Sequence, residues 1–354
     1  MKRKILAVIV PALLVAGAAN AAEVYNKDGS KLAVTGKFQA SHHFSHADSK
    51  DGDKTYARLG IRGETQINSQ LTGYGMYQTQ SNTKAAEGGN SVFTRLAFVG
   101  LDAGDAGSFD YGRNYGISYD INAWTDVLPE FGADAVAEPD RFMSLRGSNL
   151  ATYRNSSFFG LVDGLKFAVQ YQGRNDKDDR NHVDSNGDGW GLSTSYDLGA
   201  GFAAGAAYTS SDRTDGQQGD GKGDRADSVI AGVKYDANNV YLAAIYTGTH
   251  NYISETSNEI GAYNKTQGFE VVAQYMFDFG LQPSVAYVYN KAKDLENVGV
   301  KSEEIKNYAT VGATYYFNKN ISARVNYLIN NIDNDNKLGI PHDDITSVGL
   351  VYVF

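Results

Sequence analysis

The sequence predicts an all-β protein, a transmembrane barrel of sixteen antiparallel strands. Three observations lead to this fold class. Apolar and polar residues alternate with a period of two over most of the chain, which is typical of strands with two differently solvated faces. The connections between these segments alternate between short and long, and aromatic residues gather beside the short ones. Beyond residue 21, no apolar run approaches the roughly 20 residues that a membrane-spanning helix needs.

The first 21 residues have the features of a cleavable secretory signal. A positively charged start at Lys2, Arg3 and Lys4 precedes an apolar run over residues 5–19, and small residues follow it. We therefore expect residues 1–21 to be removed, so that residues 22–354 form a single barrel domain. Removing three positive charges takes the net charge from -9 to -12, and such an acidic chain argues against nucleic acid as a partner.

Rigidity has to come from the strands, because the chain contains no cysteine. This excludes a disulfide framework and a thiolate metal site. Residues 184–189 (DSNGDG) imitate the start of a calcium loop, but Ser195 stands where the twelfth-position carboxylate is needed. The six histidines have no spacing typical of a nucleophile or a metal site. We expect no metal, no cofactor and no enzymatic activity, and keep a barrel lipase or protease as a minor alternative.

The alternating segments have the same parity throughout the chain. In residues 269–277, for example, Phe269, Val271 and Tyr275 alternate with Glu270 and Gln274. Such alternation fits strands with one face toward lipid and the other toward a polar lumen. The final segment, which carries Val348, Leu350, Tyr352 and Phe354 on one face, is expected to close the wall.

Connection lengths give the topology. Short turns are expected near residues 68–70, 102–107, 162–164, 198–201, 237–239, 278–280 and 318–320. Long polar loops are expected at residues 45–54, 81–91, 117–147, 175–187, 212–225, 250–264, 292–303 and 331–343. Seven turns and eight loops join sixteen strands, and this alternation is the up-and-down pattern of outer-membrane barrels.

The third long connection, residues 117–147, differs from the rest of the chain. It carries the sequence DVLPEFGAD at residues 126–134, which combines acidic residues with a turn signal. Loops of this length are uncommon and are usually either functional or disordered. Our hypothesis is that this connection folds into the lumen and narrows it. The alternative is a mobile surface loop.

Basic residues on the wall complement these acids. Parity places five of them on the lumen face: Lys37, Arg58, Arg62, Arg95 and Arg324. A charge on the lipid face would cost about 2–4 kcal/mol at mid-bilayer, so an inward orientation is expected. With Asp126 and Glu130 on the inserted connection, the two sets would create a transverse field across a narrow aqueous passage. For any single arginine, a structural ion pair with a nearby carboxylate is the alternative.

Several motifs identify a family resemblance that covers the whole chain beyond residue 21. The sequence resembles the enterobacterial general porins of the OmpC, OmpF and PhoE type in the segments AEVYNKDG (22–29), TYARLG (55–60), FDYGRNYG (109–116), LPEFG (128–132), ATYRNS (151–156) and YVF (352–354). The resemblance implies an outer-membrane homotrimer whose third loop forms a constriction in each barrel. It implies a passive channel for small hydrophilic solutes, and from the acidic charge we expect a mild cation preference.

The resemblance also assigns individual residues. It implies a basic side of the constriction at Lys37, Arg58, Arg95 and Arg146, and an acidic side at Asp126 and Glu130. It implies that Glu87 of the second loop latches onto Arg113 of a neighbouring subunit, and that Tyr352 and Phe354 form an assembly signal for the barrel-assembly machinery. Outer-membrane lipid and lipopolysaccharide would surround the barrel. Gln78 stands where an acid is often found, which removes one charge from the lumen.

An alternative function is a substrate-specific porin with a saturable site. A ladder of aromatic side chains along the passage would favour it. The inserted connection offers only Trp124, which we expect to pack this connection against the wall.

Overall fold

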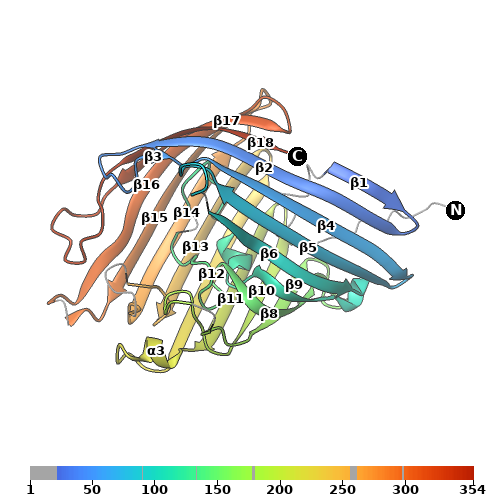
Figure 1. Ribbon diagram of the computed structural model, residues 1–354, viewed down its shortest axis with the longest axis horizontal. Coiled ribbons are helices and arrows are strands. Elements are labelled where there is room, and N and C mark those ends of the chain that lie inside the picture. Colours follow the sequence, from blue (N-terminus) through green and yellow to red (C-terminus); the bar gives the residue numbers. More distant parts are fainter. Residues whose placement is uncertain (1–21, 90, 133, 178–179, 256–260, 297–298) are drawn as a thin grey trace.

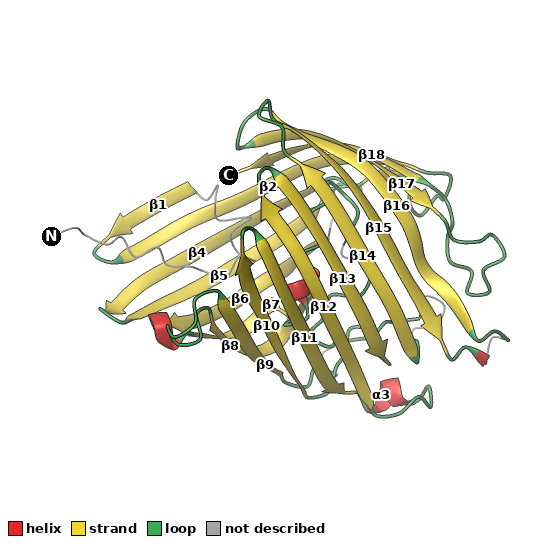
Figure 2. Cartoon of the chain, turned by 180° about the vertical axis from the view of Figure 1, so that it is seen from behind, coloured by secondary structure: helices red, strands yellow, loops and turns green. Residues whose placement is uncertain are grey.

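The computed structural model describes residues 22–354, apart from residues 90, 133, 178–179, 256–260 and 297–298. The expected signal segment, residues 1–21, lies outside the described residues. Strands dominate the structure and the helices are short segments (Figures 1 and 2). In the described part of the chain, no helix is long and apolar enough to cross a membrane.

Sixteen long antiparallel strands form a closed wall, as the sequence predicts. The strands are β2 (Ser30–Phe44), β4 (Tyr56–Asn68), β5 (Leu71–Asn82), β6 (Val92–Asp102), β7 (Ser108–Tyr115), β8 (Arg146–Asn155), β9 (Leu165–Gln172), β10 (Gly189–Gly199), β11 (Phe202–Asp212), β12 (Arg225–Ala237), β13 (Val240–His250), β14 (Lys265–Tyr275), β15 (Leu281–Lys293), β16 (Ser302–Tyr316), β17 (Ile321–Asn330) and β18 (Ile345–Val353). Each pairs with its neighbour, and β18 pairs with β2.

Two short strands supplement this wall. β3 (Gly52–Asp53) lies in the first loop, and β1 (Ala22–Lys27) pairs with the first part of β2. β18 pairs with the second part of β2, so β1 and β18 lie in line along one edge of that strand (Figure 1). The two meet at Gly36, which exchanges backbone hydrogen bonds of 2.8 and 3.0 Å with Phe354. A Cβ atom at Gly36 would overlap the Phe354 ring, so any other residue here would require that ring to move.

The expected orientation of the strand faces is confirmed. On β14, Phe269, Val271 and Tyr275 are exposed on the outside, whereas Glu270 and Gln274 are buried on the lumen side. Aromatic residues pack together next to the short turns, with ring centroids 4.7 Å apart for Tyr275 and Phe277. Rings in this position suit the interface between hydrocarbon and water.

One connection differs from the prediction. The turn expected at residues 162–164 is a longer segment, residues 156–164, because β8 ends at Asn155. The Asn155 side chain accepts a hydrogen bond of 2.8 Å from the Phe159 backbone, and the left-handed backbone at Phe158 and Phe159 (φ 45° and 61°) prevents the strand from continuing. The rings of Phe158 and Phe159 pack on Phe167 instead.

Candidate functional site

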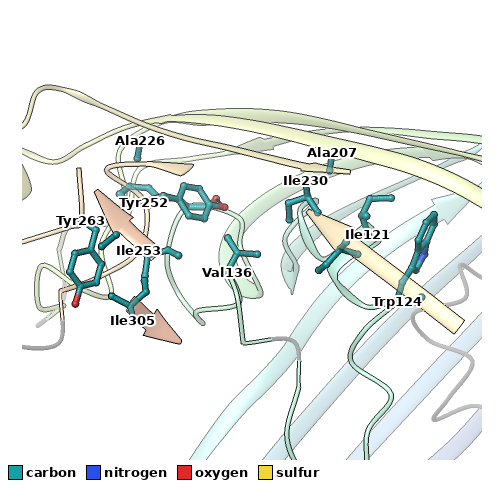
Figure 3. Close-up of a cluster of buried hydrophobic side chains, with 14 of the residues drawn as sticks. Ile121, Trp124, Val136, Ala207, Ala226, Ile230, Tyr252, Ile253, Tyr263 and Ile305 are labelled. Carbon is teal, nitrogen blue, oxygen red and sulfur yellow. Dashed lines mark hydrogen bonds between the residues drawn. The ribbon is translucent and has the colours of Figure 1, made fainter. Parts of the chain in front are cut away.

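The third long loop folds into the barrel and lies against the inner face of the wall. This inserted loop comprises residues 116–145, slightly less than predicted, because Arg146 already begins β8. It contains a one-turn helix, α2 (Tyr119–Asn122). Ile121 and Trp124 are buried against Ile230 and Ala207 of the wall (Figure 3), so Trp124 packs the loop as expected.

Glycines on the lumen face of the wall make room for α2. A Cβ atom at Gly205 would lie 2.6 Å from Ile121 and 2.9 Å from Trp124, and one at Gly191 would lie 2.6 Å from Ile117. Real Cβ atoms do not approach other atoms this closely. A glycine in a strand interior often marks a site of close approach, and here it accommodates the apolar side of the inserted loop.

Polar side chains of the wall hydrogen-bond to both limbs of the inserted loop, the segment before Glu130 and the segment after it. Glu270 of β14 contacts both, because its carboxylate accepts hydrogen bonds from Thr125 Oγ1 at 2.5 Å and from the Ala135 backbone at 2.6 Å. Further hydrogen bonds run from Tyr241 Oη to Trp124 O (2.7 Å), from Gln274 Nε2 to Val127 O (2.8 Å), from Asn290 Nδ2 to Ala135 O (2.6 Å) and from Tyr308 Oη to Asp134 Oδ2 (2.7 Å). The inserted loop is therefore fixed to successive strands from β13 to β16.

The tip of the loop, at Pro129 and Glu130, extends beyond strands β13 to β16 and contacts β17 and β2. The Glu130 carboxylate accepts hydrogen bonds from Arg324 of β17 and from Gln39 of β2, the latter at 3.3 Å. His43 Nε2 lies 3.2 Å from Glu130 Oε1. Burial raises the pKa of the Glu130 carboxyl, but the hydrogen bond from His43 and the charge of Arg324 outweigh it, so this pKa lies below its usual value.

The basic residues expected at the constriction line a different part of the wall. Lys37, Arg58, Arg95 and Arg146 come from β2, β4, β6 and the start of β8. Arg58 and Arg95 donate to the same acceptor, Gln80 Oε1, at 3.0 and 3.2 Å, and Arg95 also donates to Gln78 at 3.0 Å. Within the residues that the structure describes, none of the four basic side chains forms an ion pair with a carboxylate.

These four cations lie near one another in a row. The charge of Arg95 interacts with those of Arg58 and Arg146. Lys37 in turn interacts with Arg58, and both lie over the Tyr56 ring, with centroid distances of 5.4 and 5.3 Å. Gln78 and Gln80 accept the arginine hydrogen bonds without adding negative charge to the row.

The two acids expected opposite the row have unlike surroundings. Asp126 is exposed, and its carboxylate accepts a hydrogen bond from the neutral Tyr119 hydroxyl. Glu130 is engaged by the wall residues described above. Sequence parity had placed Arg324 on the lumen face but gave no sign that it contacts the loop tip. Gln39, His43 and Glu270 were missed as loop contacts, since polarity on the lumen face was their only signal.

The remaining predicted residues lie away from the loop tip. Glu87 is exposed in the loop of residues 83–91, and Arg113 binds Asp140 of its own chain, with Nη2 donating to Oδ2 at 2.8 Å. Tyr352 and Phe354 form an aromatic group with Phe38 on the outer face, with centroids 6.4 and 5.8 Å from the Phe38 ring.

A closed sixteen-stranded barrel with a loop anchored inside it and charges around the remaining opening defines a membrane channel. Comparison with known proteins identifies the family to which this membrane channel belongs. The family model of the Gram-negative porins matches residues 27–354. The chain is 56% identical to outer membrane porin C of Enterobacter cloacae and 54% identical to outer membrane porin N of Escherichia coli K12, in both cases over 100% of each chain. The structure of Salmonella typhi OmpF in complex with daunomycin superposes with a TM-score of 0.88 at 47% identity, covering 94% of this chain and 100% of that one.

The chain therefore belongs to the Gram-negative porin family and is an outer-membrane porin.

Proposed function

We propose that the protein is a general diffusion channel, in which the inserted loop limits the size of the small hydrophilic solutes and ions that pass. One observation carries this proposal. The loop is anchored to one side of the wall, while the row of Lys37, Arg58, Arg95 and Arg146 lies on strands outside that anchored region. Fixed charges around a narrow aqueous passage select ions by their field and exclude solutes by size. Such passage needs no catalysis, cofactor or energy source.

We further propose a mild preference for cations. The acidic composition supports it, and the loop presents negative charge at the exposed Asp126 and Asp134. Glu130 contributes less than its charge suggests, because Arg324 binds it. Asp126 and Glu130 remain our proposed acidic side, and the four basic residues remain our proposed basic side.

The assembly we propose is a homotrimer. Glu87, exposed and at the tip of its loop, is available to reach a neighbouring subunit. Arg113 is the proposed receiving residue, which would then bind Glu87 in addition to Asp140. We propose that Tyr352 and Phe354 are read by the barrel-assembly machinery, and that outer-membrane lipid and lipopolysaccharide contact the outer face.

Recordings of the purified protein in a planar bilayer under a salt gradient test this function. We expect an open conductance that closes in three equal steps and a modest reversal potential of cation sign. No conductance would contradict the channel, closure in one step would contradict the trimer, and an anion sign would contradict the selectivity. Current that one sugar blocks saturably would favour a substrate-specific porin.

The low pKa of Glu130 predicts how the loop tip responds to acid. Its contacts with Arg324 and His43 need the ionised carboxylate, so they are intact above the ordinary carboxyl pKa and are lost only as the pH falls through the lower, folded-state value. We expect the reversal potentials of the wild type and of Glu130→Gln to differ at pH 7 and still to differ at pH 5, and to converge only as the pH falls below the ordinary carboxyl pKa of about 4.3. Convergence already complete at pH 5 would contradict this assignment.

A further inference from the structure

We propose that Arg324 is a selectivity-determining residue of the channel: it neutralises Glu130 at the tip of the inserted loop and so weakens the cation preference. This inference rests on the proposed channel function. It concerns a residue outside the basic row of Lys37, Arg58, Arg95 and Arg146. Arg324 lies on β17, which β18 separates from β2, the first strand of that row.

The geometry of Arg324 makes it a specific partner of the loop tip. One guanidinium nitrogen, Nη1, donates to the backbone oxygen of Pro129, and the other, Nη2, donates to the Glu130 carboxylate. The two bonds engage consecutive residues of the loop, which fixes both the position and the orientation of the tip. The side chains of Arg324 and Glu130 are 10% and 14% exposed, so water screens this pair less than it screens a surface ion pair.

The groups around Glu130 strengthen the compensation of its charge. From β2, His43 and Gln39 contact the carboxylate, and Lys37 adds a positive charge close by. No other carboxylate contacts Arg324 within the described residues. A passing ion therefore meets a paired dipole at Glu130, whose field falls off faster with distance than that of a single charge.

Asp126 differs from Glu130 because it has no cationic partner among the described residues. Its partner is the Tyr119 hydroxyl, which carries no charge, so the field of this carboxylate is not cancelled. Asp134, which is exposed and accepts from the Tyr308 hydroxyl, resembles Asp126 in this respect, whereas Glu130 is paired with a cation. Removing the Arg324 charge would strip Glu130 of its ion-pair partner without changing any acidic residue.

The experiment compares Arg324→Gln with a matched control, Arg62→Gln, by measuring reversal potential in a KCl gradient. Arg62 is also a half-buried lumen arginine in an ion pair, with Glu64, but both residues lie on β4, and within the described residues Arg62 forms no hydrogen bond or ion pair with the inserted loop. We expect Arg324→Gln to raise the ratio of potassium to chloride permeability roughly two- to fourfold, since the negative charge of Glu130 at the loop tip loses its ion-pair partner. Arg62→Gln should change the ratio far less, and Arg324→Lys should leave it near the wild-type value.

The Glu130 variants complete the design. Glu130→Gln should shift selectivity toward anions, because it unmasks Arg324. Combining it with Arg324→Gln should restore a ratio close to that of the wild type, because both members of the pair are then neutral. If Arg324→Gln and Arg62→Gln give the same ratio while the wild type conducts, the inference is wrong and the channel function stands. A wild type that does not conduct refutes the channel function itself.

The absence of cysteine from the sequence permits a second test that does not depend on how well a variant folds. R324C is folded and purified first, and the same sample is then labelled with a cationic or with a neutral methanethiosulfonate reagent. We expect the cationic label to lower the permeability ratio toward the wild-type value and the neutral label to leave it raised. Equal ratios for the two labels, with labelling verified by mass, would overturn the proposal.

Discussion

Replacing Glu270 with alanine is expected to loosen the inserted loop and to give a channel with larger and noisier current. The carboxylate holds both limbs of the loop, through Thr125 and Ala135, and is 1% exposed. Its removal leaves the Ala135 N–H without an acceptor, at about 1–3 kcal/mol, and leaves the Thr125 hydroxyl with only the Asn122 backbone oxygen at 3.2 Å. Single-channel recording would show a higher mean conductance and excess noise in the open state.

Two variants serve as controls for Glu270→Ala. Glu270→Gln keeps an oxygen acceptor for one of the two donors and should fall between the wild type and the alanine variant. Gln274→Ala removes one hydrogen bond to the loop, the one to Val127 O, and should have a smaller effect. Wild-type conductance and noise in Glu270→Ala would show that the other hydrogen bonds and the apolar contacts of α2 hold the loop without Glu270.

Replacing both Arg58 and Arg95 with alanine is expected to widen the passage and to strengthen cation preference. The two guanidinium groups share Gln80 as an acceptor and carry two uncompensated charges of the basic row. We expect single-channel conductance to rise by roughly half and the ratio of potassium to chloride permeability to rise severalfold. Planar-bilayer recording measures both, and uptake of sugars of increasing size into proteoliposomes measures the exclusion limit.

Arg62→Ala is the control for this double variant, since it removes a lumen arginine that is already paired with Glu64. It should alter conductance little. An exclusion limit and a conductance that stay at wild-type values in the double variant would remove Arg58 and Arg95 from the constriction.

The sequence predicts the barrel well because a period of two is a local property. Each strand shows its two faces in its own residues, and the loop lengths show the order of connection, so β14 and the lumen orientation of Arg58 follow without knowledge of distant partners. The segment at residues 156–164 was the exception. Phe158 and Phe159 resemble the aromatic end of a strand, and nothing local reveals their left-handed backbone.

Local sequence patterns did not predict which wall residues contact the inserted loop. Parity shows which face a residue occupies, but not which point of a distant loop will reach it. Arg324 and Pro129 are 195 positions apart, and His43 and Glu130 are 87 apart. The same holds for Glu270, whose parity predicts a polar lumen residue and whose contacts with the loop depend on the complete barrel.

Closure between β2 and β18 has a consequence for how the protein folds. The contact between Ser45 Oγ and Asp344 O joins residues 299 positions apart, so the contact order of the closing pair is very high. Entropy is lost in bringing these strands together before their hydrogen bonds form, which makes closure slow. Until then, β2 and β18 are unpaired edges that lipid cannot satisfy and that other chains can join. Folding is therefore expected to finish late, and protection from aggregation is needed until β18 is in place.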